Sequence, residues 1–191
     1  MGKISTIAVA VCLATAAVTL DPGAASANRL TASGIVTVIG TSDAGMCVKA
    51  MSRDDRTDAS YWCTRTIRRA ESTIGDRAVA HMNLGVLHLQ AGRLDLARDA
   101  LEDAIQLAPD YGDAHFQRGN LLFSEGRFAE AVLAYDRALA SAPSTPDVVH
   151  YNRGRAYGRL GQADKAEADL DRARSLMPED SPLRQRLSSA R

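Results

Sequence analysis

One residue pattern recurs three times in this 191-residue chain, at steps of 34 and 35 residues. The copies begin at His81, His115 and His150 and read HMNLGVLHLQAGRLDLARDALEDAIQLAPD, HFQRGNLLFSEGRFAEAVLAYDRALASAPS and HYNRGRAYGRLGQADKAEADLDRARSLMPE. A repeat of this length is one supersecondary unit that cannot bury its apolar face alone, so neighbouring copies must stack. The sequence therefore predicts a solenoid.

Each copy predicts a pair of helices. Apolar residues recur at three- and four-residue intervals from Leu94 to Ala108, and the preceding segment 79–90 carries a second such face. Glycine tolerates the left-handed conformation at a helix end and proline cannot continue a helix, so the two helices are expected to end near Gly92 and Pro109.

Small residues mark the expected crossing of the two helices. The positions that match in all three copies are Gly85, Gly119, Gly154; Gly92, Gly126, Gly161; Ala97, Ala131, Ala166; Leu101, Tyr135, Leu170; Ala104, Ala138, Ala173; and Pro109, Pro143, Pro178. Gly85 and Ala97 let the two backbones approach closely, and a large residue at Gly119 is expected to overpack this contact.

These positions resemble the tetratricopeptide repeat (TPR) family over residues 78–111, 112–145 and 147–180. The resemblance implies an all-α, right-handed superhelix (α-solenoid) of three full repeats, whose first helices line a concave, peptide-binding groove. The chain departs from the family at the fourth repeat position, which is often tryptophan there and is histidine in all three copies here.

A degenerate helical hairpin is expected before the first full repeat, over residues 44–77. Counting back 34 residues places Cys63, Ile67 and Ala70 at the positions of Ala97, Leu101 and Ala104 in the repeat pattern. Residues 45–52 would then be its first helix and the polar stretch SRDDRTD its bend.

A capping helix is expected after the last repeat, over residues 181–191. Ser181 suits the helix cap and Pro182 the first turn. Leu183 and Leu187 would cover the last repeat, and the side chains expected to face water are Arg184, Gln185, Arg186 and Ser188.

Residues 28–43 form an expected leader with a short β-like segment. GIVTVIG, residues 34–40, is rich in β-branched residues and bounded by glycine, which is typical of an extended strand. It cannot form a sheet alone. It is either a mobile leader or packs against the helical body, the groove or a partner.

Residues 1–27 are expected to be a secretory signal peptide. Lys3 precedes the apolar segment 4–20, and Ala25 and Ala27 place small residues where cleavage after Ala27 requires them. An uncleaved membrane anchor is the alternative, although a 17-residue segment with four Ser or Thr residues is short and weakly apolar for a span. The layout is similar to small exported bacterial TPR proteins, which implies the periplasm, with the extracellular space as the alternative.

Export would place the two cysteines that follow the signal peptide in an environment where they can form a disulfide. Cys47 and Cys63 each lie eight residues from Asp55, at the centre of the expected bend. Disulfides persist outside the cytosol, so a Cys47–Cys63 bridge is predicted, with two free buried thiols as the alternative.

The residues offer no catalytic, cofactor or metal site. Lys plus Arg equals Asp plus Glu at 23 each, so the basic excess of a nucleic-acid-binding protein is missing. The equivalent histidines lie on successive hairpins, too far apart to share one metal. Carboxylates such as Asp99 and Asp169 are expected on solvated helix faces, so the chain is predicted not to be an enzyme.

A groove remains as the candidate site. The TPR resemblance assigns its lining to Asn83, Val86, Gln90, Phe116, Gln117, Asn120, Phe123, Tyr151, Asn152, Arg155 and Arg159. The amides can donate hydrogen bonds to a peptide backbone and accept them from it, and the aromatic rings can form apolar pockets. Arg155 and Arg159 could bind an acidic side chain or a C-terminal carboxylate. The amides could instead bond neighbouring helices. The chaperone-binding carboxylate clamp of some relatives is not implied, because Met82 and Val86 replace its lysine and asparagine.

The expected function is therefore non-enzymatic protein–protein interaction. The groove would bind an extended peptide or segment of a protein partner, with no cofactor, no nucleic acid and no membrane span after signal cleavage. The alternative is a structural subunit of a cell-envelope assembly that uses the convex face or the solenoid ends.

Overall fold

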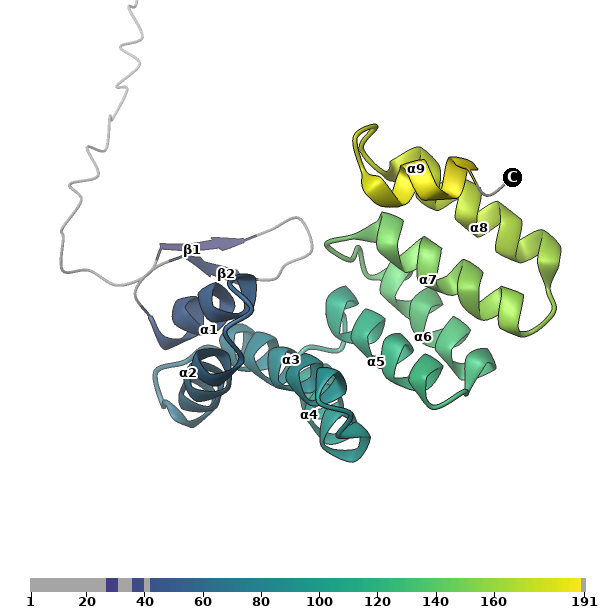
Figure 1. Cartoon of the computed structure of the whole chain (residues 1–191). Coiled ribbons are helices and arrows are strands. Elements are labelled where there is room, and N and C mark those ends of the chain that lie inside the picture. Colours follow the sequence, from purple (N-terminus) through teal and green to yellow (C-terminus); the bar gives the residue numbers. More distant parts are fainter. Residues whose placement is uncertain (1–26, 31–35, 40–41, 190–191) are drawn as a thin grey trace, which may run out of the picture.

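The computed structural model describes residues 27–30, 36–39 and 42–189 of the chain, which contain nine helices and two short strands (Figure 1). The expected signal peptide lies outside these residues, apart from Ala27. The elements are β1 (Ala27–Leu30), β2 (Val36–Ile39), α1 (Asp43–Ser52), α2 (Arg56–Arg68), α3 (Ile74–Gln90), α4 (Leu94–Leu107), α5 (Gly112–Ser124), α6 (Phe128–Ala140), α7 (Pro146–Arg159), α8 (Ala163–Leu176) and α9 (Pro182–Ser189).

The helices form successive hairpins that stack in sequence order, which confirms the predicted all-α solenoid. The hairpins are α1–α2, α3–α4, α5–α6 and α7–α8. Each first helix contacts the first helix of the next hairpin, whereas successive second helices make no such contact within the described residues. The stack therefore curves toward its first helices, and α1, α3, α5 and α7 line the concave side.

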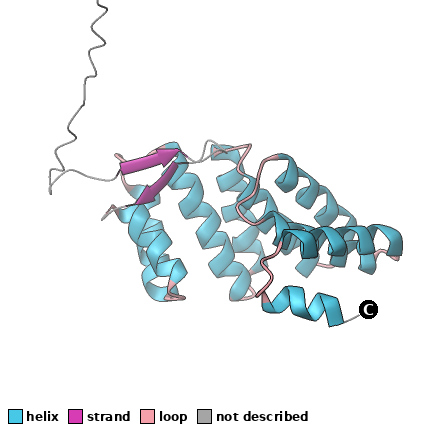
Figure 2. Ribbon diagram, turned by 90° about the horizontal axis from the view of Figure 1, so that it is seen from above, coloured by secondary structure: helices cyan, strands magenta, loops and turns pink. Residues whose placement is uncertain are grey.

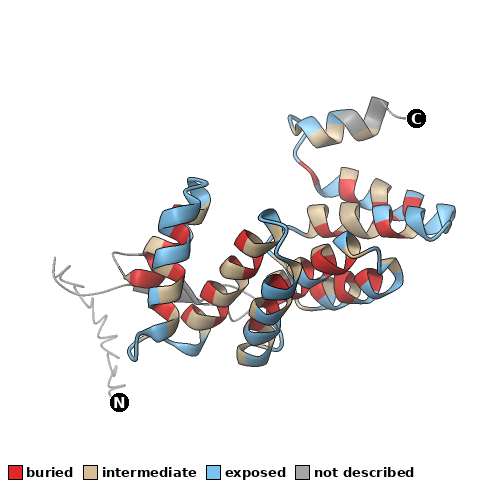
Figure 3. Cartoon of the chain, turned by 60° about the horizontal axis from the view of Figure 1, so that its bottom comes forward, coloured by how far each residue is buried: buried red, intermediate tan, exposed pale blue. Residues whose placement is uncertain are grey.

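The predicted small residues lie where the helices of a hairpin touch. A Cβ at Gly85 would lie 2.7 Å from Leu101 Cγ, and a Cβ at Gly119 would lie 2.4 Å from Tyr135 Cε1. Ala97, whose side chain is fully buried, belongs to the same close crossing. Buried residues accordingly follow the facing sides of the hairpins in Figure 3. The close approach depends on side chains of almost no volume.

The glycines at the hairpin turns have the backbone conformation that the sequence predicted. Gly92, Gly126 and Gly161 have φ of +69°, +76° and +72°. After Gly92, the Arg93 amide donates to the His88 carbonyl at 2.9 Å, and the Gly92 amide donates to that of Leu89 at 3.0 Å. This bonding is the Schellman motif, which satisfies the last carbonyls of α3.

A disulfide joins the two helices of the N-terminal hairpin, between the predicted cysteines. Cys47 on α1 and Cys63 on α2 are bonded, with their Cα atoms 4.8 Å apart, and both are fully buried. Asp55 caps α2 by accepting from the Asp58 amide, so the hairpin bends at the polar stretch as expected. α1 begins at Asp43 rather than Gly45, because Ser42 caps it by accepting from the Gly45 amide.

A two-stranded ribbon precedes the hairpin. The expected strand within residues 34–40 is β2, and it pairs antiparallel with β1, from Ala27 opposite Ile39 to Leu30 opposite Val36. The partner strand β1 was not predicted. The ribbon lies beside the N-terminal helices, where β2 contacts α1 and α3, both of which belong to the concave side (Figure 2).

The C-terminal helix α9 covers only part of the last repeat. Within the described residues it contacts α8 and no other helix or strand. Two arginines attach it, since Arg174 donates to the Leu187 carbonyl at 3.0 Å and Arg184 donates to that of Met177 at 2.8 Å. Arg184 was expected to face water, and its bond to a carbonyl at the end of α8 corrects that expectation. No helix of the described chain is long and apolar enough to cross a membrane.

Substitution of Gly119 tests the crossing of α5 and α6. Gly119→Ala should lower the free energy of unfolding by about 1–3 kcal/mol, because the new methyl group would overlap the Tyr135 ring. Gly158→Ala is the matched control, since nothing lies within 4 Å of a Cβ at this helical position. The control should stabilise by about 0.5–1 kcal/mol through helix propensity. Urea denaturation of both variants measures the difference, and equal effects would contradict the crossing.

Removal of the disulfide tests the N-terminal hairpin. The double variant Cys47→Ala with Cys63→Ala should lose about 3 kcal/mol of unfolding free energy relative to the oxidised protein, because the bridge restrains a short loop of the unfolded chain. Denaturation with and without a thiol reductant measures this loss. The reductant should not affect the variant. Two alkylatable thiols in the non-reduced protein would contradict the bridge.

Candidate functional site

A pocket of about 600 Å³ lies between the first helices α5 and α7, with second helix α6 beneath it. Its lining contains Asn120, Phe123 and Ser124 of α5, Gly126 of the following turn, Phe128 and Tyr135 of α6, and Asn152, Arg155 and Arg159 of α7. Two consecutive repeats build it, so neither repeat alone could form the site.

Aromatic rings hold the two arginines of the pocket. The Arg155 guanidinium carbon lies 4.9 Å from the centre of the Phe123 ring and 5.7 Å from that of Tyr151. Arg159 lies 4.9 Å from the centre of the Phe128 ring, which meets Phe123 edge to face at 5.2 Å. Ring faces attract cations, so these contacts orient both guanidinium groups at the mouth of the pocket.

A chain of amides crosses the pocket floor. Asn152 Nδ2 donates to Asn120 Oδ1 at 3.0 Å, and Asn120 Nδ2 donates to Gln117 Oε1 at 3.0 Å. The Tyr135 hydroxyl also donates to Asn120 Oδ1, at 2.9 Å. Burial raises the pKa of Tyr135 well above its usual range despite the opposing charge of Arg155, so the hydroxyl stays protonated and remains a donor. The floor is thereby fixed in one orientation.

The pocket brings together five of the residues that the sequence assigned to the groove: Asn120, Phe123, Asn152, Arg155 and Arg159. Gln117 and Tyr151 adjoin it through the contacts above. Phe116 is instead buried against the Tyr135 ring, with ring centres 6.0 Å apart, so it supports the floor from the core. Asn152 bonds to the neighbouring helix α5, which is the alternative that the sequence left open, whereas Gln117 and Asn120 bond to each other within α5.

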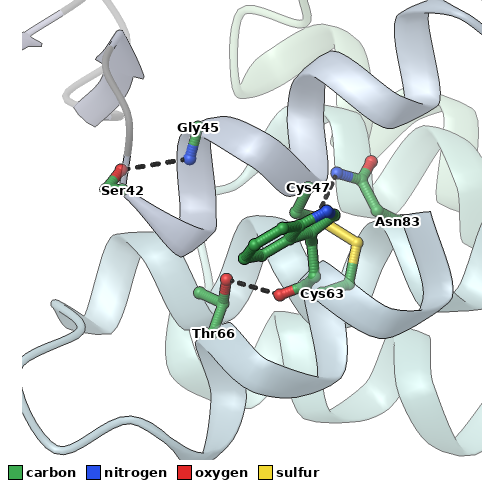
Figure 4. Close-up of a disulfide and its surroundings, with 7 residues drawn as sticks. Ser42, Gly45, Cys47, Cys63, Thr66 and Asn83 are labelled. Carbon is green, nitrogen blue, oxygen red and sulfur yellow. Dashed lines mark hydrogen bonds between the residues drawn. A yellow bond between two sulfur atoms is a disulfide. The ribbon is translucent and has the colours of Figure 1, made fainter. Parts of the chain in front are cut away.

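The first repeat contributes nothing to this pocket. Asn83 is buried, and its Nδ2 lies 3.4 Å from Cys47 Sγ, so the amide faces the disulfide rather than open groove (Figure 4). Val86 is half-buried and Gln90 is exposed at the end of α3, and neither lines the pocket. The continuous amide ladder that the sequence suggested is therefore wrong at Asn83, because the N-terminal hairpin covers this position.

Four lining residues were missed by sequence reasoning. Phe128 and Tyr135 belong to the second helix, Ser124 ends α5, and Gly126 is in the turn, whereas the groove pattern counts only first-helix positions. Tyr135 carried a usable signal. It is the one residue with a hydroxyl at a position that holds leucine in the other two repeats.

Two of the equivalent histidines, His81 and His150, connect the helices of their hairpins, and His115 contacts the loop before α5. His81 Nδ1 lies 3.3 Å from Asp103 Oδ2, His115 Nε2 lies 2.7 Å from the Pro109 carbonyl oxygen, and His150 Nδ1 lies 2.8 Å from Asp169 Oδ1. Each histidine thus has a separate partner within its own part of the stack. Among the residues that the structure describes, no group of histidine, cysteine and carboxylate side chains is arranged to hold a metal ion.

Asp169 is buried rather than solvated, which corrects the expectation for this carboxylate. Burial alone would raise its pKa, but hydrogen bonds and charges from Arg153 and His150 outweigh burial and lower the pKa. Arg153 Nε donates to Asp169 Oδ2 at 2.7 Å, and Arg153 also pairs with Asp136. Charged side chains therefore join α7 to α6 and α8 behind the pocket.

Comparison with known proteins shows the family. Tetratricopeptide repeat sequence models match residues 60–111, 82–146 and 148–180, together well over half of the chain, so the protein belongs to the TPR family. The first match begins within α2, at residue 60. TPR repeats form protein–protein interaction modules, and the fold is typically a non-catalytic scaffold.

The relatives found by sequence comparison are much longer than this chain. The chain is 35% identical over 96 residues to Protein CTR9 homolog of Arabidopsis thaliana, covering 50% of this chain and 9% of that protein. It is 35% identical over 78 residues to RNA polymerase II-associated protein 3 of Gallus gallus, covering 41% of this chain and 12% of that protein. The chain thus spans about a tenth of the length of these relatives.

Solved structures share the fold. PilW, described as a widely conserved type IV pilus biogenesis factor, matches with a TM-score of 0.64 and 22% identity over 74% of this chain and 63% of its own. TTC0263, a thermophilic TPR protein of Thermus thermophilus, matches with a TM-score of 0.60 and 24% identity over 78% of this chain and 79% of its own. These likenesses establish the architecture alone.

Acid titration tests the charged contact behind the pocket. Because the folded-state pKa of Asp169 is lowered, its stabilising contribution is present above the ordinary aspartate pKa of about 4 and is lost as the pH falls through the folded value. Asp169→Asn should therefore cost about 1–3 kcal/mol of unfolding free energy at neutral pH, and less as the pH approaches about 3. Denaturation across this range measures the change. Asp99→Asn, at an exposed position of α4, is the matched control and should cost less than about 0.5 kcal/mol at neutral pH.

Proposed function

We propose that the protein is an exported, non-enzymatic scaffold that binds an extended segment of a partner protein in its concave groove. The observation that carries this proposal is the α5–α7 pocket, which combines amides, aromatic rings and cations from two consecutive repeats. Such a mixture suits a peptide, whose backbone needs hydrogen-bond partners and whose side chains need apolar or charged contacts.

The shape of the pocket supports an elongated ligand. Its α7 lining runs from Asn152 to Arg159, which corresponds to about 10 Å of helix length at about 1.5 Å per residue. This length accommodates about three residues of extended chain. Phe123 and Phe128 provide an apolar wall, and the fixed amide floor beside them presents polar atoms to the backbone.

The lining supports binding rather than catalysis. Its ionisable members are Tyr135, Arg155 and Arg159. Tyr135 is kept protonated by burial, and an arginine is always charged in a protein, so neither type supplies a general base near neutral pH. The pocket therefore suits recognition.

Export is supported by the covalent hairpin. A fully buried disulfide such as Cys47–Cys63 belongs to proteins of oxidising compartments, and the apolar N-terminal segment 4–20 would direct the chain there. The proposed location is the periplasm, and extracellular release is the alternative.

A structural role in an envelope assembly is the second candidate. Large apolar side chains are exposed on second helices, away from the concave side: Leu96 of α4 is 48% exposed and Leu133 of α6 is 67% exposed. Exposed leucines of this kind can be docking points for another subunit.

Site-specific photo-cross-linking separates the two candidates. A photoreactive phenylalanine analogue placed at Ser124, an exposed residue of the pocket lining, should capture the partner in the native cell envelope. The same analogue at Leu133 is the matched convex-face control and should capture little. Mass spectrometry of the conjugate then locates the bound segment, which should be extended and continuous. Capture from Leu133 alone would reject the groove and favour the structural role.

A further inference from the structure

Arg155 and Arg159 have no carboxylate partner among the described residues, whereas Arg98, Arg127 and Arg153 each have one. Neighbouring acidic groups are engaged elsewhere. Glu125, at the C-terminal cap of α5, pairs with Arg98 and Arg127. The pocket lining itself contains no acidic residue. Two adjacent positive charges are thus left without a counter-charge from the described chain at the mouth of the groove.

The aromatic contacts leave these charges able to bind. Each guanidinium lies near the face of a phenylalanine ring, and a guanidinium directs its N–H groups outward in its own plane. The donors of both groups can therefore reach an acceptor that enters the pocket beside the rings. Carboxylate oxygens match this fork geometry and form strong charge-assisted hydrogen bonds with arginine.

The spacing of the two arginines matches an extended chain. Arg155 and Arg159 are four residues apart on α7, which corresponds to a rise of about 6 Å along the helix. Side chains on one side of an extended peptide repeat every second residue, about 6.5–7 Å apart. A peptide that lies along the valley between α5 and α7 would place alternate side chains opposite the two guanidinium groups.

The groove is open beyond α7. The C-terminal helix α9 contacts α8 and none of the first helices within the described residues, so it does not close the concave side. The pocket itself is open to solvent rather than enclosed, so a chain can pass through it without ending there. This favours acidic side chains within a segment over a terminal carboxylate.

We infer that the pocket selects an acidic peptide segment, with Asp or Glu at two alternate positions bound by Arg155 and Arg159. The inference rests on the proposed peptide-binding function and adds the chemistry of the partner. It involves residues other than the lysine and asparagine that the family's carboxylate clamp needs in its first repeat, which are Met82 and Val86 here.

Panning of a phage-displayed random dodecapeptide library on the purified full chain tests the inference. Wild-type protein should enrich peptides with acidic residues at alternate positions. The double variant Arg155→Gln with Arg159→Gln should lose this preference. Enrichment without acidic preference would overturn the inference and leave the proposed function standing. Failure of the folded wild-type protein to enrich any peptide would overturn both.

Fluorescence polarisation with synthetic forms of the best-enriched peptide measures the contribution of each carboxylate. Replacement of one acidic residue by its amide, or of either arginine by glutamine, should weaken binding about tenfold. Moving the acidic residues to adjacent positions should weaken it similarly. Arg118→Gln, which removes the same charge from an exposed position of α5 outside the pocket, should change the Kd less than about twofold, on the order of a rim charge. Equal losses for all three arginine variants would show only general attraction between opposite charges and overturn the inference.

A comparison of chain ends distinguishes the source of the carboxylate. The same peptide with a free or an amidated C-terminus should bind equally, because the side chains supply both charges. Dependence of binding on the free terminus, with no effect of the acidic side chains, would reject the proposed segment in favour of chain-end recognition.

Discussion

The contact between a glycine in one helix and a large side chain in its partner underlies the whole molecule. Gly119 accepts the Tyr135 ring so closely that even a methyl group would overlap it, and Gly85 does the same for Leu101. These contacts fix how each hairpin closes. Hairpins of one shape can stack repeatedly, and the concave side is the cumulative result of that stacking. The pocket between α5 and α7 thus depends on the glycines at these helix crossings.

Much of this architecture could be predicted because it is local and repeated. Gly92 and its equivalents predicted the turns, the alanines predicted the crossings, and the spacing of Cys47 and Cys63 about a polar bend predicted the bridge. Five of the pocket residues were also predictable, since first-helix positions that face inward are set by helical periodicity once the fold is known.

Contacts between distant elements were beyond the reach of the sequence pattern. The pattern placed Asn83 in the groove, but the N-terminal hairpin turns it toward Cys47. Asp169 was expected on a solvated helix face, but in the structure it is buried in contact with Arg153 and His150. Phe128 lines the pocket and β1 pairs with β2, and neither contact follows from a position in the repeat pattern. Each miss concerns a pairing that depends on how different elements meet.

The position of Asn83 limits how much of the concave side is available to the proposed peptide. With that amide turned toward the disulfide and β2 in contact with α1 and α3, the proposed peptide site comprises two repeats and would contact only a few residues of a partner. So small a footprint implies modest affinity and rapid exchange for any single motif. Durable association would then require several copies of this chain to be held together on a partner that displays several motifs, because avidity needs linked sites on both sides.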